Sequence, residues 1–238
     1  MTKLDAQRVL IVGGSRDIGL AVAQAVTEAG ATAIIGARDQ LRADEAAKNV
    51  TGAEAVYMNI THEDSIVSGL EKCGRVDHIV VTTSAHHNAA VTDLDHEKTQ
   101  AAFEAKIIGP LMLAKHAASI LPSTGSIVLF SGVAAWNPDP GYSIMAITNG
   151  AVSFAAAHLA KELAPIRVNA LSPGVIDSGS WDVMGEDAKQ EFLSGAAEST
   201  LVNRYGQNSD ITDGVLWLLT AGFISGETIH IEGGARFN

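Results

Sequence analysis

Short apolar runs rich in β-branched residues recur along the chain, and most of them are continuous rather than alternating with polar positions. Continuous runs of this length are typical of strands that are buried on both faces of a sheet. The runs that predict strands are 9–12, 33–35, 55–58, 79–81, 127–130, 168–171 and 228–231. We therefore expect seven strands in a sheet whose two faces are both covered by helices.

Helical spacing of apolar residues appears between these runs. The first helix is predicted by Ile18, Ala21, Val22, Ala25, Val26 and Ala29, which follow the i, i+3, i+4, i+7 pattern of one helix face, and Gly30 is expected to end it. Residues 151–163 predict a second helix that stops before Pro165, and 215–219 predict a third. This alternation predicts an α/β fold with a doubly wound parallel sheet in a single domain, 1–238.

One segment, residues 177–199, has only a weak pattern. It is polar, dotted with glycine, and carries Trp181 and Met184. A polar insertion of this kind is typical of a lid, so we expect a mobile flap over a pocket.

Charge and composition exclude several classes of protein. The net charge is −11 and there is no basic run, which argues against a nucleic-acid partner. No apolar run approaches about 18–20 residues, and the N-terminus lacks the pattern of a signal peptide, so no membrane partner is expected. Cys73 is the single cysteine, which excludes an internal disulfide and a cysteine-based metal cluster and favours a cytoplasmic setting.

A glycine-containing loop, Gly13-Gly14-Ser15-Arg16-Asp17-Ile18-Gly19, joins the first predicted strand to the first predicted helix. Small residues there let backbone N–H groups approach a pyrophosphate, and the helix N-terminus favours its negative charge. The alternative is a tight turn that holds no ligand.

This loop resembles that of the short-chain dehydrogenase/reductase family, T-G-x-x-x-G-I-G, with Val12 at the Thr position and Asp17 at the middle Gly. Two further stretches resemble the family: 163–174, which includes Asn169 and Pro173-Gly174, and the C-terminal 225–234. The resemblance implies a Rossmann fold whose nucleotide-binding half spans about 1–130, and it implies a nicotinamide cofactor. It also implies a small-molecule carbonyl or alcohol substrate, and a homodimer or homotetramer.

Cofactor choice follows from the end of the second strand. Ala37 stands where an NAD-binding fold places an acid, Arg38 follows it, and Arg16 adds a cation, so NADP is the predicted cofactor. Alternatively, Arg38 is a solvated surface charge, or Asp39 pairs with it. The predicted cofactor-binding residues are Gly13, Ser15, Arg16, Asp17, Ile18, Gly19, Arg38, Asn59, Ile60, Thr83, Ser84, Pro173, Gly174, Ile176 and Ser178.

Catalysis in this family uses four residues, Asn, Ser, Tyr and Lys, and the resemblance places different residues at most of these positions here. The resemblance places Tyr142 at the Tyr position, but Ala146 stands where the Lys is expected one helical turn later. The Ser position falls on Gly132, next to Ser131, and the Asn position falls on Lys106. We predict Tyr142, Ser131 and Lys106 as the catalytic residues, with Lys106 partly replacing the missing lysine.

The alternatives without a catalytic role are that Tyr142 is an ordinary helix residue, and that Lys106 points outward or pairs with Glu104 or Asp95. The predicted substrate residues are His86, His87, Trp136 and Trp181. The alternative for the two histidines is that they are solvated loop residues, and no metal site is predicted.

Together these features predict an NADP(H)-dependent oxidoreductase that interconverts a carbonyl and an alcohol. The alternative is a nucleotide-binding sensor, or a non-catalytic homologue that has lost turnover. The segment with Ile229, Ile231 and Phe237 is expected to be covered in an oligomer; otherwise the two isoleucines form a last strand inside the monomer.

Overall fold

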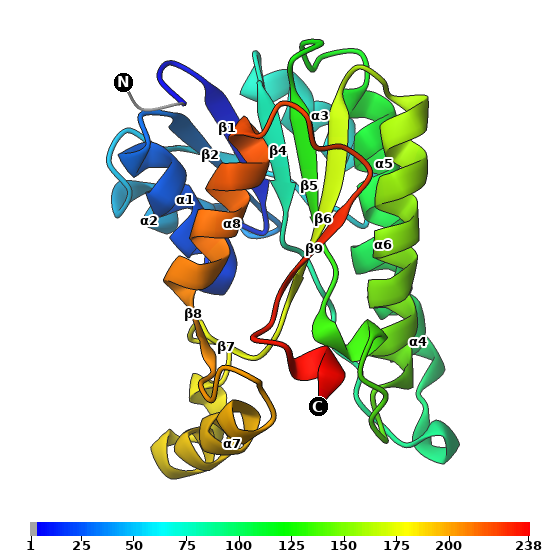
Figure 1. The fold of residues 1–238 in the computed structure, drawn as a ribbon. Coiled ribbons are helices and arrows are strands. Elements are labelled where there is room, and N and C mark those ends of the chain that lie inside the picture. The colour runs from blue at the N-terminus through cyan, green and yellow to red at the C-terminus, as the bar shows by residue number, and fades with distance from the viewer. Residues whose placement is uncertain (1–3) are drawn as a thin grey trace.

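Seven parallel strands form one twisted sheet in the computed structural model, which describes residues 4–238. Their order is β3-β2-β1-β4-β5-β6-β9 (Figure 1). The strands are β1 (Arg8–Val12), β2 (Thr32–Ala37), β3 (Glu54–Tyr57), β4 (His78–Val81), β5 (Ser126–Phe130), β6 (Arg167–Pro173) and β9 (Thr228–Ile231). The strand order reverses between β1 and β4, and ligands of such sheets bind outside the carboxyl ends of the strands at that point.

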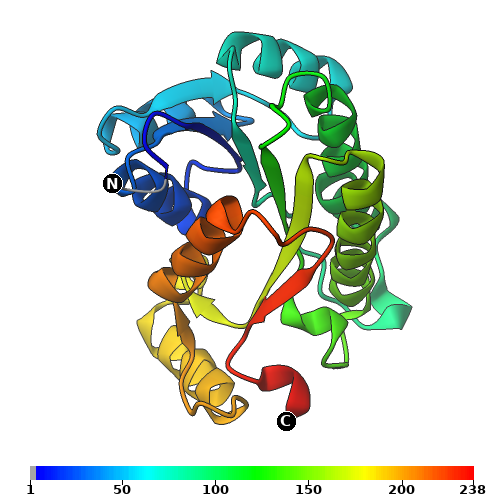
Figure 2. The same cartoon turned by 45° about the horizontal axis from the view of Figure 1, so that its top comes forward.

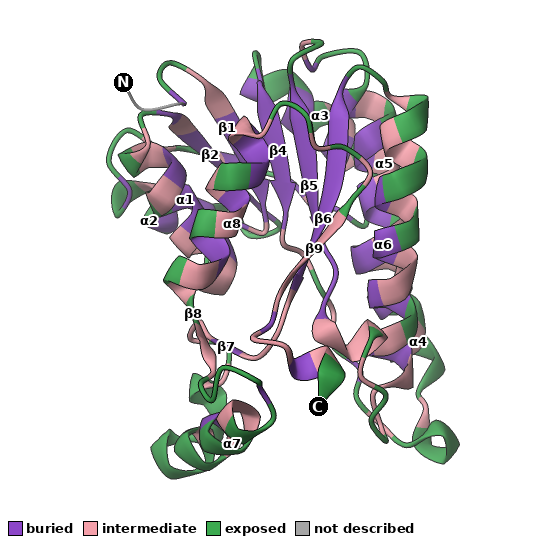
Figure 3. Cartoon of the chain, viewed as in Figure 1, coloured by how far each residue is buried: buried purple, intermediate pink, exposed green. Residues whose placement is uncertain are grey.

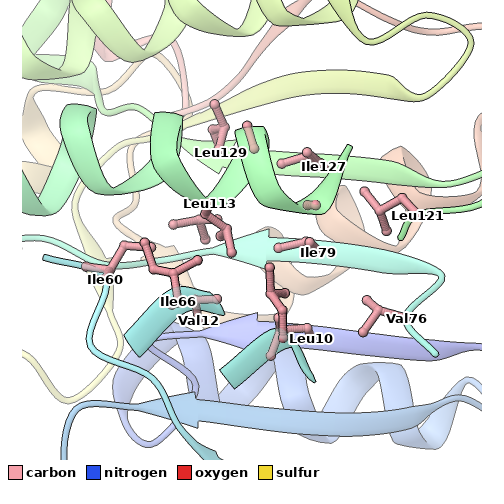
Figure 4. Packing of buried hydrophobic residues seen from close by; sticks show 14 of the residues in the cluster. Leu10, Val12, Ile60, Ile66, Val76, Ile79, Leu113, Leu121, Ile127 and Leu129 are labelled. Carbon is pink, nitrogen blue, oxygen red and sulfur yellow. The ribbon is translucent and has the colours of Figure 1, made fainter. Parts of the chain in front are cut away.

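Helices cover both faces of the sheet, as Figures 1 and 2 show. One layer contains α1 (Asp17–Glu28), α2 (Gln40–Lys48) and α8 (Asn208–Thr220), and the other contains α3 (Glu63–Cys73), α5 (Gly109–Ala117) and α6 (Ser143–Glu162). Each layer seals its own apolar core against the sheet. Figure 4 shows the second core, in which Leu10, Ile79 and Ile127 of the strands face Leu113 of α5.

The remaining elements lie beyond the carboxyl ends of the strands (Figure 1). They are α4 (His96–Phe103), the π-helical η2 (Glu104–Ile108), α7 (Glu186–Glu198), the paired strands β7 (Ile176–Asp177) and β8 (Gly206–Gln207), and the short 3₁₀ turns η1 (Val91–Asp93), η3 (Val133–Ala135), η4 (Asp182–Met184) and η5 (Ala235–Phe237). Figure 3 shows the contrast in burial between the sheet and the exposed α7.

All seven predicted strands are present, and the predicted fold class is confirmed. The helix predicted from residue 151 begins earlier, at Ser143. This helix, α6, is long and apolar enough to cross a membrane by length and composition, but it buries one face, with Val152 and Ala156, against the sheet.

The flap predicted at 177–199 contains a turn and a regular helix, α7. The sequence pattern missed this helix because only one of its residues, Leu193, is buried. The mobility of this segment stays a prediction.

The C-terminal strand β9 pairs with β6 and completes the sheet within the chain. Ile229 and Ile231 pack against the first core, so they belong to a last strand of the monomer. Phe237, by contrast, is 70% exposed.

Candidate functional site

A cavity of about 1030 Å³ opens at the carboxyl edge of the sheet. Its walls come from the β1–α1 loop, the ends of β2, β3, β4 and β5, and the inner side of α4 and η2. It therefore runs across the point where the strand order reverses, from Arg38 near one end to Lys106 and Ser131 near the other.

The β1–α1 loop packs too tightly for side chains at two positions. Gly13 has φ +92°, and a Cβ there would stand 2.7 Å from the Thr82 hydroxyl oxygen. A Cβ on Gly19 would collide with the carbonyl oxygen of Gly13. The N-terminus of α1 has no side-chain cap, so its backbone N–H groups are available to an anion in the cavity.

Asp17 replaces glycine in this loop and keeps a glycine-like backbone, with φ +50°. Its carboxylate lies 3.5 Å from the Arg16 guanidinium. It also reaches toward the flap, since a Cβ on Gly179 would stand 3.4 Å from its Oδ1. The loop thus places a negative charge beside the anion-binding helix end.

Arg38, which directly follows β2, lines the same end of the cavity as the β1–α1 loop. Asp39 caps α2 by accepting the Arg42 N–H at 3.2 Å and pairs with the Arg42 guanidinium at 3.4 Å. The alternative in which Asp39 neutralises Arg38 is therefore wrong. Asn59 also lines the cavity, but its amide is already engaged by Thr61 and His62.

Lys106 lines the end of the cavity that lies away from Arg38. Its side chain is buried, and Nζ donates to the carbonyl oxygen of Ser131 at 3.2 Å and to Oδ1 of Asn149. Burial lowers the pKa of Lys106 to about 7. The readings in which this lysine points outward, or pairs with Glu104 or Asp95, are wrong. It sits in the π-helical turn η2, a local geometry that is frequent at functional sites.

Ser131 lines the cavity, but its hydroxyl is engaged in hydrogen bonds with other residues of the protein. The hydroxyl donates to the carbonyl oxygen of Asn149 at 2.8 Å and receives the Ser153 hydroxyl at 3.1 Å. Ser131 therefore acts on the site through its backbone carbonyl, which holds Lys106, rather than through the hydroxyl that was predicted.

Tyr142 is not among the residues that line the cavity. It is the N-cap of α6, where it is half-buried, as is Ala146. Met145 and Asn149 are buried one helical turn apart, and Asn149 contacts Lys106. The face of α6 that turns toward the site thus carries Met145 and Asn149, and the assignment of the family's Tyr and Lys positions to Tyr142 and Ala146 is out of phase.

Asn149 is the functional residue that the sequence reasoning missed. Its amide occupies space that a side chain at Gly132 would need, because a Cβ there would stand 2.7 Å from Nδ2. Gly132, Asn149 and Lys106 therefore fit one another as a set. The available signal was the spacing of Met145, Asn149 and Val152, which places them on one helical face.

Among the predicted substrate residues, only His86 lines the cavity. Its pKa is lowered by partial burial and by the cations Lys106 and Arg16. His87 is buried and accepts the Asp95 N–H at 3.0 Å, which fastens the start of α4.

The two predicted tryptophans lie elsewhere. Trp136 makes an edge-to-face contact with His230, with ring centroids 5.0 Å apart. Trp181 packs against Phe192 of α7, with the ring planes tilted by 49°, and donates from Nε1 to the carbonyl oxygen of Ile176 at 2.9 Å. Both stabilise segments around the site without lining it.

Eleven of the fifteen predicted cofactor-binding residues line the cavity, and Pro173, Gly174, Ile176 and Ser178 do not. Gly174 and Ile176 border a separate cavity of about 60 Å³. Ser178 lies 3.1 Å from the hydroxyl of Ser180, which does line the main cavity. These residues follow β6 and lead into the flap.

Comparisons with known proteins agree with this geometry. A family model described as Enoyl-(Acyl carrier protein) reductase matches residues 12–236. Short-chain dehydrogenase/reductase ucsE of Acremonium sp is 30% identical over 254 residues, which cover 98% of this chain and 96% of the relative. The 3-oxoacyl-(acyl-carrier-protein) reductase FabG of Aquifex aeolicus is 29% identical, with 98% of each chain covered.

Two solved structures are similar over nearly the whole chain. A small-chain dehydrogenase in complex with NADPH has a TM-score of 0.86 and 27% identity, covering 98% of this chain and 100% of the other. The MalC Reductase/Diels-Alderase of Malbranchea aurantiaca has a TM-score of 0.92 at 23% identity, covering 100% of this chain and 99% of the other, a likeness of fold.

Proposed function

The chain belongs to the short-chain dehydrogenase/reductase family of oxidoreductases, and we propose that it interconverts a carbonyl and an alcohol on a small molecule with NADP(H). The observation that carries this proposal is one cavity that joins a phosphate-type loop and Arg38 at one end to a buried, ionisable Lys106 at the other. A redox site of this family needs both parts: a place for the nucleotide and a group that handles a proton.

The residues present fit a dinucleotide phosphate. The close packing at Gly13 and Gly19 leaves the uncapped end of α1 open to a pyrophosphate. Arg38 has no ion-pair partner among residues 4–238, so its guanidinium is available for a 2′-phosphate. When bound, the cofactor supplies or receives a hydride; the protein orients both reactants and manages the proton.

The first test is cofactor binding by calorimetry. Two charge-assisted contacts, from Arg38 and Arg16, favour NADPH over NADH by at least about 10-fold in dissociation constant. Equal dissociation constants for the two cofactors would contradict the NADP assignment. The second test follows loss of NADPH absorbance with a broad panel of aldehydes and ketones.

The runner-up is a nucleotide-binding sensor without turnover. It is favoured by the hydroxyl of Ser131, which is committed to Asn149, and by the position of Tyr142 outside the cavity. NADPH binding with no turnover across the panel would support this reading over the oxidoreductase.

We also propose a cytoplasmic homodimer or homotetramer, as the family resemblance implies. Ile147 and Phe154 on the outer face of α6 are 55% and 72% exposed, and burying them would favour association. A monomer mass in light scattering at micromolar concentration would contradict this assembly. The cytoplasmic setting rests on the single cysteine, Cys73, and is tested by fractionation of cells that express a tagged protein.

A further inference from the structure

We propose that Lys106 itself is the proton donor and acceptor of the reaction, held in place by Asn149 and by the backbone of Ser131. This inference rests on the proposed oxidoreductase function and names the residue that completes it. It replaces the expectation that Lys106 merely assists Tyr142, since Tyr142 does not line the cavity.

The hydrogen bonds of Lys106 leave one position of Nζ for a substrate. An ammonium group has three N–H donors, and two are taken by the Ser131 carbonyl oxygen and by Asn149 Oδ1. The third is not claimed by any residue of 4–238, and the side chain lines the cavity. A substrate oxygen in the cavity is therefore the natural acceptor for this proton.

The same two contacts persist when Lys106 is neutral. A primary amine retains two N–H donors and gains a lone pair, so it still satisfies both oxygens and offers the lone pair to the cavity. Neither partner is a carboxylate that would lock the lysine in its charged form. The pocket therefore accepts both protonation states in one geometry, as a residue that gives and takes a proton requires.

Burial, rather than a neighbouring charge, keeps the two protonation states of Lys106 close in energy near neutral pH. Burial lowers the pKa of Lys106 to about 7. From the loop after β4, His86 lines the same cavity and interacts electrostatically with Lys106 and Arg16. From α4 and η2, Glu97 and Glu104 line the same cavity, while α6 and β5 contribute only the uncharged groups named above.

The reduction balances as follows. The carbonyl carbon receives the hydride and its electron pair, the C=O double bond becomes a single bond, and the oxygen takes the third proton from Nζ. The products are the alcohol, the oxidised cofactor and a neutral Lys106, which then takes a proton from water. Oxidation of the alcohol runs through the same steps in reverse.

One test needs no substrate: competitive acylation with acetic anhydride across pH, read residue by residue by mass spectrometry. Neutral amines react, so Lys106 is expected to become reactive about 2 to 3 pH units below the ordinary lysine pKa of 10.5, with Lys115, an exposed lysine paired with Glu63, as the internal reference for labelling. NADPH is expected to protect Lys106 selectively. Titration of Lys106 near the ordinary lysine pKa of 10.5, or no reaction at any pH, would overturn the proposal.

The kinetic test uses the best compound of the carbonyl panel. Lys106→Met is expected to lower kcat for reduction by about 100-fold or more, while the dissociation constant of NADPH changes by less than about threefold. Lys106→Arg keeps a charge but cannot release a proton, and it is expected to lose oxidation as well. Thermal unfolding of each variant shows that it is folded.

Asn149→Asp provides a variant that keeps Lys106 and moves its titration. A carboxylate at this position stabilises the ammonium, so the decline of reduction at high pH is expected to move up by about 1 pH unit or more. An unchanged pH profile would overturn the proposed role of the pair. Turnover that Lys106→Met leaves intact defeats this inference alone, whereas a parent protein that binds NADPH and reduces nothing defeats the proposed function with it.

Discussion

The two ends of the cavity are built in different ways. The nucleotide end is made of consecutive residues, Gly13 to Gly19, and of Arg38 directly after β2. The reactive end is assembled from η2, the end of β5 and the middle of α6, which contribute Lys106, Ser131 and Asn149. A local motif tolerates change one residue at a time, whereas a set of interlocking side chains changes together. We propose that the nucleotide end keeps the family's form while the reactive end has been rebuilt.

The largest effect is expected from forcing a family-like residue into the rebuilt end. In Gly132→Ser the new Cβ would stand 2.7 Å from Nδ2 of Asn149, so the amide must shift, and this shift disturbs its contact with Lys106. We expect a loss of stability of about 1–3 kcal/mol and a fall in kcat of about 100-fold. Chemical denaturation and steady-state kinetics measure these two effects.

Gly150→Ala is the matched control for that variant. A Cβ there would meet only the Ala135 side chain at 3.9 Å, and alanine favours a helix interior by about 0.5–1 kcal/mol. This variant is expected to be slightly more stable and fully active. If both glycine variants behave alike, the reactive end is not interlocked and the contrast between the two ends is lost.

The second prediction concerns the pH dependence of the free energy of unfolding, to which Lys106 at the reactive end is expected to contribute. The folded pKa of Lys106 lies near 7, below its ordinary value of 10.5, so between these values the unfolded chain binds a proton that the folded protein lacks. Stability is therefore gained as pH rises through this window, with a slope of at most about 1.4 kcal/mol per pH unit. Urea unfolding at pH 7, 8 and 9 should show a shallower rise for Lys106→Met than for the parent.

Lys115→Met provides the control for this slope because Lys115 is exposed and paired with Glu63. It should leave the pH dependence between 7 and 9 close to that of the parent. Parallel curves for Lys106→Met and the parent would show that Lys106 is solvated, contrary to its buried position.

The strands and the nucleotide end could be predicted from the sequence because their signals are local. Buried parallel strands appear as continuous apolar runs, and a phosphate loop is a short motif between a strand and a helix. Lys106 was singled out as well, from a resemblance that placed it at the site. Ser131 was predicted at the same site, but through its hydroxyl rather than its backbone carbonyl, and Asn149 was not predicted.

The reactive end was harder to predict because it depends on the phase of one helix. The polar residues Thr148 and Asn149 concealed the first turns of α6, so the helix was predicted to begin at 151. Tyr142 was assigned from the family resemblance alone, without the helix phase that brings Asn149 to Lys106. The flap helix α7 was missed for the opposite reason: it buries only Leu193 and so lacks an apolar stripe. Neither feature can be read from neighbouring residues alone.

The third prediction concerns specificity at the nucleotide end. Arg38→Ala should weaken NADPH binding by about 10-fold and leave NADH binding nearly unchanged. The reason is that the lost guanidinium is expected to bind the 2′-phosphate, which only NADPH carries. Lys48→Ala removes one positive charge from the last turn of α2, away from the cavity, and should change neither constant. Calorimetry with both cofactors makes the comparison, and an equal loss for NADPH and NADH would mean that Arg38 does not read the phosphate.

The smallest effect is expected at Asp17, where the nucleotide end departs from the family. Its carboxylate stands at the N-terminus of α1 and engages Arg16, so it competes with an incoming pyrophosphate for both. Asp17→Asn removes the charge at nearly constant shape and should tighten NADPH binding by about 3- to 5-fold at low salt, with a smaller gain at high salt.

The Asp17→Asn variant should also lose about 0.3–1 kcal/mol of stability, since an acid in the first turn favours the helix. Asp17→Gly should show the same gain in binding with a smaller loss, because glycine adopts the φ of +50° without strain. Weaker NADPH binding in both variants would mean that the carboxylate holds Arg16 in a productive position, and that this end has also been rebuilt as a set.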